Sequence, residues 1–180
     1  MGANRAIITN TTRGNRLGRL ARLAALALLL AGLSPGAGLR AEDKLPLPRF
    51  ASLQSNEVNM RQGPGETYPI IWTYQRAGLP VEIIEEFDIW RRIRDHDGVV
   101  GWVKSTLLVG KRHVIIRDEQ RPLRKSPDAG ALPVAQIDPG VILKVLECAG
   151  DWCRLEVQGY KGWMMKTEFW GVYQAETLED

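Results

Sequence analysis

The chain has 180 residues, with 24 Lys and Arg against 21 Asp and Glu, and a formal net charge of +3 at pH 7. This length allows one domain of ordinary size or two small ones, and it excludes large folds such as a full TIM barrel. A hydrophobic content of 44% and a charged content of 25% are normal for a folded chain. The 18 Gly and 10 Pro favour turn-rich β structure.

Residues 1–41 have the layout of a secretory signal peptide. Arginines and no acidic residues precede an uncharged apolar run of 11 residues, Leu23–Leu33, and turn-forming residues follow it. The run is too short to span a bilayer, which needs roughly 20 residues. A buried amphipathic helix is the alternative interpretation, although the run has no polar face. We therefore expect export, with cleavage after Ala41 or, alternatively, near Ala37 or Gly38.

Removal of this segment reverses the net charge. It contains six Arg and no acid, so 18 basic residues remain against 21 acidic ones, a net charge of −3. A nucleic-acid partner therefore loses the electrostatic support that the whole chain suggests. We expect a soluble periplasmic or secreted protein without nucleic acid and without a membrane span after cleavage of the signal.

The rest of the chain repeats itself. Residues 42–54 contain two prolines and little periodicity, and we interpret them as a linker. Two matching segments follow, a first copy at 55–110 and a second copy at 111–173, before an acidic tail at 174–180. The two copies share the spacing of several residues. Arg61 and Pro64 recur as Arg124 and Pro127 with an offset of 63, and the Gly-Trp pair at 101–102 recurs at 162–163 with an offset of 61. A repeat of this size equals one small domain.

Within each copy the pattern is that of short strands. Apolar and β-branched runs at 80–87 and 141–147 end at polar turns, and the segments that follow at 90–94 and 152–157 alternate with a period of two. Turns at intervals of about 8–12 residues favour a small β-barrel or sandwich. No segment after residue 41 has convincing helical periodicity, so we expect an all-β fold.

Four motifs in a fixed order resemble a bacterial SH3 (SH3b) domain. In the first copy they are R-x-G-P-G at 61–65, G-x-x-V-x-I-I at 78–84, D-x-W-x-R-I at 88–93 and G-W-V at 101–103. The second copy matches more loosely, and Asp128 stands where the first copy has Gly65. The resemblance implies two tandem small SH3-like β-barrels in an exported protein. It also implies a non-catalytic binding or targeting role, often towards cell wall or peptide; if the G-P-G turn shapes a ligand loop, only the first copy binds.

The two cysteines, Cys148 and Cys153, flank a four-residue turn between predicted strands. They should face each other across a hairpin, where Cβ atoms come within about 4.5–5.5 Å, and a non-hydrogen-bonded pair would suit a disulfide. An oxidising compartment favours the bond. Glu86 and Arg91 occupy the equivalent positions of the first copy, so we expect an ion pair there.

Redox catalysis or metal binding is the alternative for the cysteines. Four residues intervene, which is not the C-x-x-C spacing of thioredoxin-like sites. A zinc site needs four ligands, and His96 and His113 fall outside the hairpin. We therefore expect a structural disulfide, with no metal and no cofactor.

The sequence contains no G-x-S-x-G, H-E-x-x-H, P-loop or dinucleotide motif, so we expect no enzymatic activity. Aromatic residues are the better indication of function. We predict a ligand groove in the first copy built from half-exposed rings at Tyr68, Trp72, Trp90 and Trp102. The alternative is that these rings cover the barrel surface and the interface between the copies. The expected ligand is peptidoglycan or an envelope peptide or protein; alternatives are a scaffold for an exported partner or a regulatory subunit of an envelope hydrolase.

Overall fold

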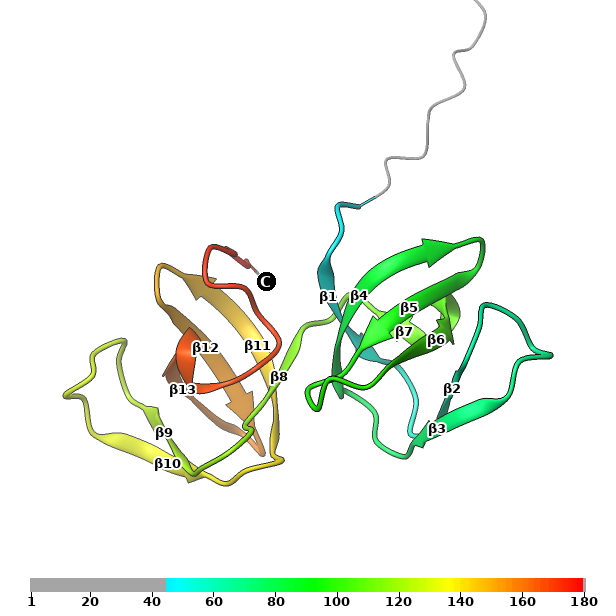
Figure 1. Cartoon of the computed structure of the whole chain (residues 1–180). Helices are drawn as coiled ribbons and strands as arrows, with labels where there is room; N and C mark the ends of the chain where they lie inside the picture. The colour runs from blue at the N-terminus through cyan, green and yellow to red at the C-terminus, as the bar shows by residue number, and fades with distance from the viewer. Residues whose placement is uncertain (1–44, 180) are drawn as a thin grey trace, which may run out of the picture. The chain divides into compact units, whose positions relative to one another are not determined.

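A computed structural model describes residues 45–179, and the expected signal peptide and its cleavage site lie outside the described residues. The described chain is built from β-strands, as expected, and its only helices are two short 3-10 turns. The strands form one seven-stranded and one six-stranded sheet (Figure 1). In this part of the chain we find no helix of sufficient length and hydropathy to cross a membrane.

The first sheet has the order β3-β2-β6-β5-β4-β1-β7. Its elements, including the 3-10 turn η1, are β1 (Arg49–Leu53), β2 (Val58–Arg61), β3 (Ile70–Tyr74), β4 (Pro80–Phe87), β5 (Trp90–Arg94), β6 (Val100–Lys104), η1 (Ser105–Leu107) and β7 (Leu108–Val109). All pairings in this sheet are antiparallel.

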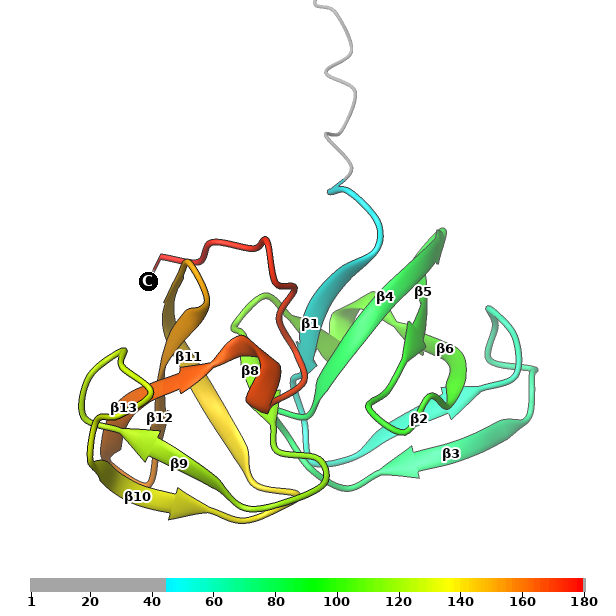
Figure 2. The same ribbon diagram turned by 60° about the vertical axis from the view of Figure 1, so that its left-hand side comes forward.

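The second sheet has the order β10-β9-β13-β12-β11-β8. Its elements are β8 (His113–Ile115), β9 (Arg121–Arg124), β10 (Pro133–Ile137), β11 (Ile142–Ala149), β12 (Trp152–Val157), β13 (Tyr160–Met165) and the 3-10 turn η2 (Lys166–Glu168). Apart from β7, this order repeats that of the first sheet, with β8 beside β11 where β1 lies beside β4 (Figures 1 and 2). The long hairpins β4–β5 and β11–β12 also share a shift in strand register, which follows Ile83 in the first and Val145 in the second.

The expected linker at 42–54 is wrong for residues 49–53, which form β1. This strand pairs with β4 on one side and with β7 on the other. Four of its five residues are buried, so it lacks the alternation of a half-buried strand. Sequence periodicity therefore could not detect it.

Each copy has its own hydrophobic core. Alternate residues of neighbouring strands fill the first, among them Val58, Met60, Val81, Ile93 and Val103. The second contains Val114, Leu123, Leu143, Leu155 and Met164. Second-copy side chains also reach the first core: Ile115 belongs to it, and Ile142 and Trp170 pack against it.

The Gly-Trp motif has a steric cause in both copies. A Cβ atom on Gly101 would lie 2.6 Å from Cγ of Met60 and 2.9 Å from the carbonyl oxygen of Arg61. A Cβ atom on Gly162 would lie 2.6 Å from the carbonyl oxygen of Arg124. Glycine therefore permits β6 to approach β2, and β13 to approach β9, closely enough to complete each sheet.

Candidate ligand-binding surface

The G-P-G motif forms a surface on which Tyr68 packs. A Cβ atom on Gly63 would lie 2.5 Å from Cδ1 of Tyr68, and one on Gly65 would lie 3.2 Å from Cδ2. The ring therefore rests directly on the loop backbone, yet 45% of Tyr68 remains exposed. A side chain at either glycine would displace the ring.

Arg61 holds this loop in place. Its Nη1 donates hydrogen bonds to the carbonyl oxygens of Glu66 at 3.0 Å and Tyr68 at 2.8 Å. The backbone N–H of Gln62 donates to the carbonyl oxygen of Pro69 at 3.0 Å and closes the base of the loop. The R-x-G-P-G motif thus specifies both the shape of the loop and the position of the tyrosine.

An exposed apolar strip follows the loop along β3. Ile70, Ile71 and Trp72 are exposed by 47%, 45% and 52%. Within the described residues β3 ends the first sheet and pairs only with β2. We call Tyr68, Ile70, Ile71 and Trp72 the β3 strip. Exposed apolar side chains on an edge strand are typical of an interaction site.

Tyr74 fixes the far end of this strand. Its hydroxyl donates a hydrogen bond of 2.8 Å to Oδ2 of Asp95, and its ring lies 6.4 Å from that of Trp72. Burial, together with the hydrogen bond to Asp95, raises the pKa of Tyr74 above its ordinary value. The neutral hydroxyl therefore remains a donor, and β3 is anchored at the end opposite the loop.

The expected half-exposure is wrong for Trp90 and Trp102, which are only 6% and 9% exposed. Although it is buried, Trp90 lies outside the cluster of core residues that contains Ile93, because the two side chains point to opposite faces of β5. However, the long side chains of neighbouring strands share its face: Nζ of Lys104 lies 5.9 Å from the centroid of the Trp90 ring. Trp102 pairs across the sheet with Arg61 and Arg92, which share its face in the same way.

The four predicted ligand-binding residues are thus divided between two places. Tyr68 and Trp72 are exposed on the β2–β3 hairpin, while Trp90 and Trp102 are buried on the outer face of β5 and β6. Both places belong to the first copy. Their role in binding stays a prediction.

Sequence reasoning missed a pocket on that outer face. Its volume is about 280 Å³, and it is lined by Glu57, Asn59, Arg61, Glu66, Trp90, Lys104 and Leu107. We call it the Arg61 pocket. Lys104 forms an ion pair with Glu66, and the hydrogen bond and charge of Lys104 lower the pKa of Glu66. The Arg of the R-x-G-P-G motif could have indicated this pocket, but only if the register between the strands had been known.

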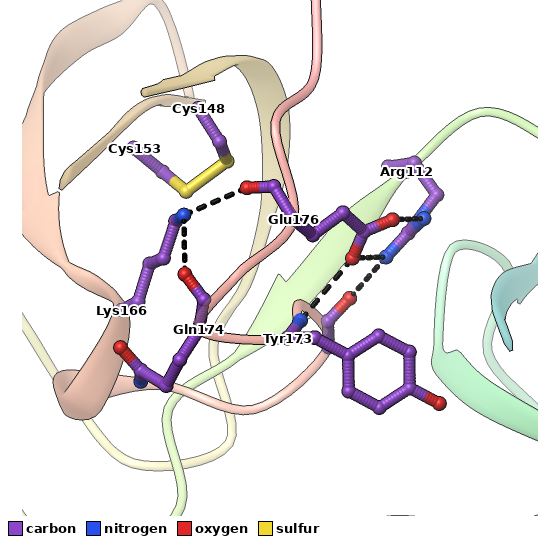
Figure 3. Close-up of a disulfide and its surroundings, with 8 residues drawn as sticks. Arg112, Cys148, Cys153, Lys166, Tyr173, Gln174 and Glu176 are labelled. Carbon is purple, nitrogen blue, oxygen red and sulfur yellow. Dashed lines mark hydrogen bonds and ion pairs between the residues drawn. A yellow bond between two sulfur atoms is a disulfide. The ribbon is translucent and has the colours of Figure 1, made fainter. Parts of the chain in front are cut away.

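The predicted disulfide between Cys148 and Cys153 is present (Figure 3). The two residues face each other in the β11–β12 register, with their Cα atoms 4.1 Å apart. The backbone N–H and C=O of Cys148 bond to Leu178 instead of Cys153, at 2.8 and 3.0 Å. The cysteines therefore form a non-hydrogen-bonded cross-strand pair, as expected. The expected ion pair is also present: Nε of Arg91 lies 3.0 Å from Oε1 of Glu86.

The tail after η2 is tied down beside the disulfide. Nζ of the buried Lys166 donates hydrogen bonds to the carbonyl oxygens of Gln174 at 2.9 Å and Glu176 at 2.7 Å. The carboxylate of Glu176 in turn accepts a hydrogen bond of 2.6 Å from Arg112 (Figure 3). Among residues 45–179, no group of three or more His, Cys, Asp or Glu is placed to hold a metal ion.

Comparison with known proteins gives a family and a small set of relatives. The family model described as "Bacterial SH3 domain" matches residues 54–110 and 117–171. The chain is 26% identical over 126 residues to "Putative N-acetylmuramoyl-L-alanine amidase YrvJ" of Bacillus subtilis (strain 168). That match covers 60% of this chain, which spans 24% of the length of the relative.

Two solved structures are also similar. NlpC1 from Trichomonas vaginalis has a TM-score of 0.32 and 12% identity, over 72% of this chain and 48% of that one. An NlpC/P60 family protein from Bacillus cereus ATCC 10987 has the same TM-score of 0.32 and 12% identity, over 67% of this chain and 55% of that one.

Proposed function

Because this chain belongs to the bacterial SH3 domain family, we propose that it is a non-catalytic binding module of the cell envelope, periplasmic or secreted, that recognises peptidoglycan or its peptides. The wall amidase name of the Bacillus subtilis relative supports a wall ligand. The disulfide supports an oxidising compartment.

The observation that carries the proposal is the β3 strip. An extended peptide adds to the free edge of β3 through backbone hydrogen bonds, and alternate side chains meet the exposed apolar residues. The Tyr68 and Trp72 rings supply stacking area for peptide bonds or sugar faces. Rings of this kind dominate binding energy where they become desolvated.

Retention on purified, insoluble cell wall tests the proposal. Wild-type protein sediments with the wall, and Trp72→Ala and Tyr68→Ala each lower its affinity about tenfold or more, as expected for aromatic hot spots. Tyr160→Ala is the matched control, because Tyr160 is 57% exposed but lies on the β12–β13 hairpin of the second copy. Failure of the wild-type protein to bind the wall overturns the proposal.

A separate measurement tests the absence of catalysis. Pure protein incubated with labelled wall fragments leaves them intact if it acts as a binding module alone. Release of label that depends on the protein overturns this part of the proposal and favours an envelope hydrolase.

A further inference from the structure

The Arg61 pocket has a counterpart in the second copy, and there it is filled. Arg124 and Trp152 correspond to Arg61 and Trp90, and the guanidinium carbon of Arg124 lies 5.5 Å from the centroid of the Trp152 ring. Nη1 and Nη2 of Arg124 donate hydrogen bonds of 2.8 and 2.9 Å to the two carboxylate oxygens of Glu168. A bidentate pair of this kind fixes both the position and the orientation of the carboxylate.

The backbone completes this carboxylate site. The N–H of Met165 donates a hydrogen bond of 2.9 Å to Oε2 of Glu168. Burial alone would raise the pKa of Glu168, but the hydrogen bonds from Arg124 and Met165 outweigh it and lower the pKa below its ordinary value. Three donors beside an aromatic ring therefore hold Glu168 in its ionised form.

The first copy keeps the arginine and replaces the carboxylate. Leu107 in η1 stands where the second copy has Glu168 in η2, and Lys104 stands where it has Met165. Within residues 45–179 Arg61 has no carboxylate at ion-pair distance, and its Nη1 bonds to loop carbonyls instead. Lys104 adds an ammonium group beside the Trp90 ring. At these two positions the pocket thus gains a basic side chain and loses the acid that fills its counterpart, while Glu57 and Glu66 among its lining residues balance Arg61 and Lys104.

We propose that the Arg61 pocket binds the C-terminal carboxylate of a peptide ligand, held by the Arg61 guanidinium as Arg124 holds Glu168 and by the Lys104 ammonium, a group that Met165 lacks. The inference deepens the proposed function and rests on it, because the pocket and the β3 strip belong to the same copy. The pocket binds the C-terminal end of the peptide, and the β3 strip binds its other residues.

The acids of the pocket are consistent with this ligand. The Glu66 side chain is 69% exposed, so its ion pair with Lys104 is a weak surface contact that an incoming carboxylate displaces. Glu57 lines the same pocket and accepts hydrogen bonds from the N–H groups of the peptide. Removal of the Glu66 charge should therefore tighten binding.

An NMR titration of the protein tests the inference. The probe is N-acetyl-D-alanyl-D-alanine, with the C-terminal amide of the same dipeptide as its control; the reporters are the Trp90 indole N–H and the Arg61 Nε–H. The acid binds about tenfold more tightly than the amide, because a charge-assisted bond is lost in the amide. The L,L dipeptide separates the two sources of such a carboxylate, because ribosomally made proteins end in L-residues: tighter binding of the D,D acid supports a wall peptide, and tighter binding of the L,L acid supports a protein C-terminus. Equal binding of acid and amide overturns the inference.

Two variants should lower the affinity of the pocket for the acid, and one should raise it. Lys104→Met weakens the acid about fivefold, Glu66→Gln tightens it about twofold, and Leu107→Glu abolishes binding by supplying an internal carboxylate. Leu107 packs against the core, so the two solvent-facing variants keep the test valid if Leu107→Glu does not fold. Lys161→Met is the matched control, because this exposed lysine lies on β13 of the second copy. Weakening by Glu66→Gln, or equal shifts at Trp152, overturns the inference.

Wall retention separates this inference from the proposed function. If wild-type protein binds the wall but does not discriminate acid from amide, the pocket inference fails and the wall function stands. If it discriminates acid from amide but does not bind the wall, the wall function fails and the pocket inference stands.

Discussion

Tyr173 donates a hydrogen bond of 2.7 Å to Oε1 of Glu82 and so joins the end of the second copy to β4 of the first. Glu82 is only 6% exposed and also accepts a hydrogen bond of 2.8 Å from Nε of Arg94. Beside this bond, the Phe50 ring lies 4.8 Å from that of Trp170 and 4.6 Å from that of Tyr173. The two copies therefore share a polar and aromatic interface.

Replacement of Tyr173 by Phe tests the polar part of this interface. The variant keeps the ring contact with Phe50 but removes the hydrogen bond to a buried carboxylate. We expect the free energy of unfolding to fall by about 1.5–3 kcal/mol, the usual value for a hydrogen bond to a charged group. Urea denaturation measures it, with Tyr160→Phe as the exposed control. An unchanged midpoint in Tyr173→Phe would show that the bond contributes nothing.

The contact between His113 and Ser52 predicts a pH dependence. Nδ1 of His113 lies 3.0 Å from Oγ of the buried Ser52. Burial lowers the pKa of His113, and the nearby charges of Lys144 and Lys111 lower it further, while a hydrogen bond from the imidazole to the backbone carbonyl of Lys111 raises it. Between the lowered pKa of His113 in the folded protein and its ordinary value of about 6.5 in the unfolded chain, the unfolded state binds more protons. Stability therefore falls as the pH drops below about 6.5.

Thermal unfolding at pH values from 7.5 to 5.5 checks this expectation. The wild-type protein loses stability on acidification, and His113→Gln, which cannot titrate, loses less over the same interval. A wild-type stability that rises on acidification would contradict the sign that we derive.

The disulfide and its ionic counterpart predict a difference between the copies. Replacement of both Cys148 and Cys153 by Ala should cost about 2 kcal/mol, because so short a loop limits the unfolded chain only modestly. Arg91→Ala removes the cross-strand ion pair with Glu86 and should cost about 0.2–1 kcal/mol. Chemical denaturation measures the free energy of unfolding of both variants. A larger decrease for Arg91→Ala than for the double cysteine variant would contradict the prediction.

Glycine substitutions test the close approach of the strands. Gly101→Ala places a Cβ atom 2.6 Å from Met60 and 2.9 Å from backbone, and we expect it to cost about 1–3 kcal/mol through overpacking. Gly110→Ala is the matched control, because no heavy atom lies within 4 Å of the added Cβ. Differential scanning calorimetry should show a clearly lower Tm for Gly101→Ala alone. Equal Tm values would mean that β2 and β6 move apart at little cost.

Much of the fold could be predicted from local sequence. Alternation and turn residues indicate the hairpins, and the offset between the copies places Glu86 and Arg91 where Cys148 and Cys153 stand. The strand β1 could not be found in this way, because four consecutive residues are buried, the polar Ser52 among them, and polarity does not alternate between its two faces.

The candidate site was predictable only in part. The exposure of Tyr68 and Trp72 agrees with a local pattern, but the burial of Trp90 depends on Lys104, which reaches it from the next strand. The proposed role of the Arg61 pocket comes from comparing the two copies, because it rests on the hydrogen bond between Arg124 and Glu168 in the second copy. Alternation within one strand carries no information on such contacts.

The two long hairpins are fastened at the same register by different chemistry, and this gives each copy its own chemical vulnerability. Salt weakens the pairing of Glu86 with Arg91 only in part, because both side chains are mostly buried, and it leaves a covalent bond unaffected. A thiol reductant breaks the bond between Cys148 and Cys153 but does not act on charges. A thiol reductant therefore acts on the hairpin of the second copy alone, whereas salt acts on both hairpins, because the second also carries the exposed cross-strand pair of Glu147 with Arg154.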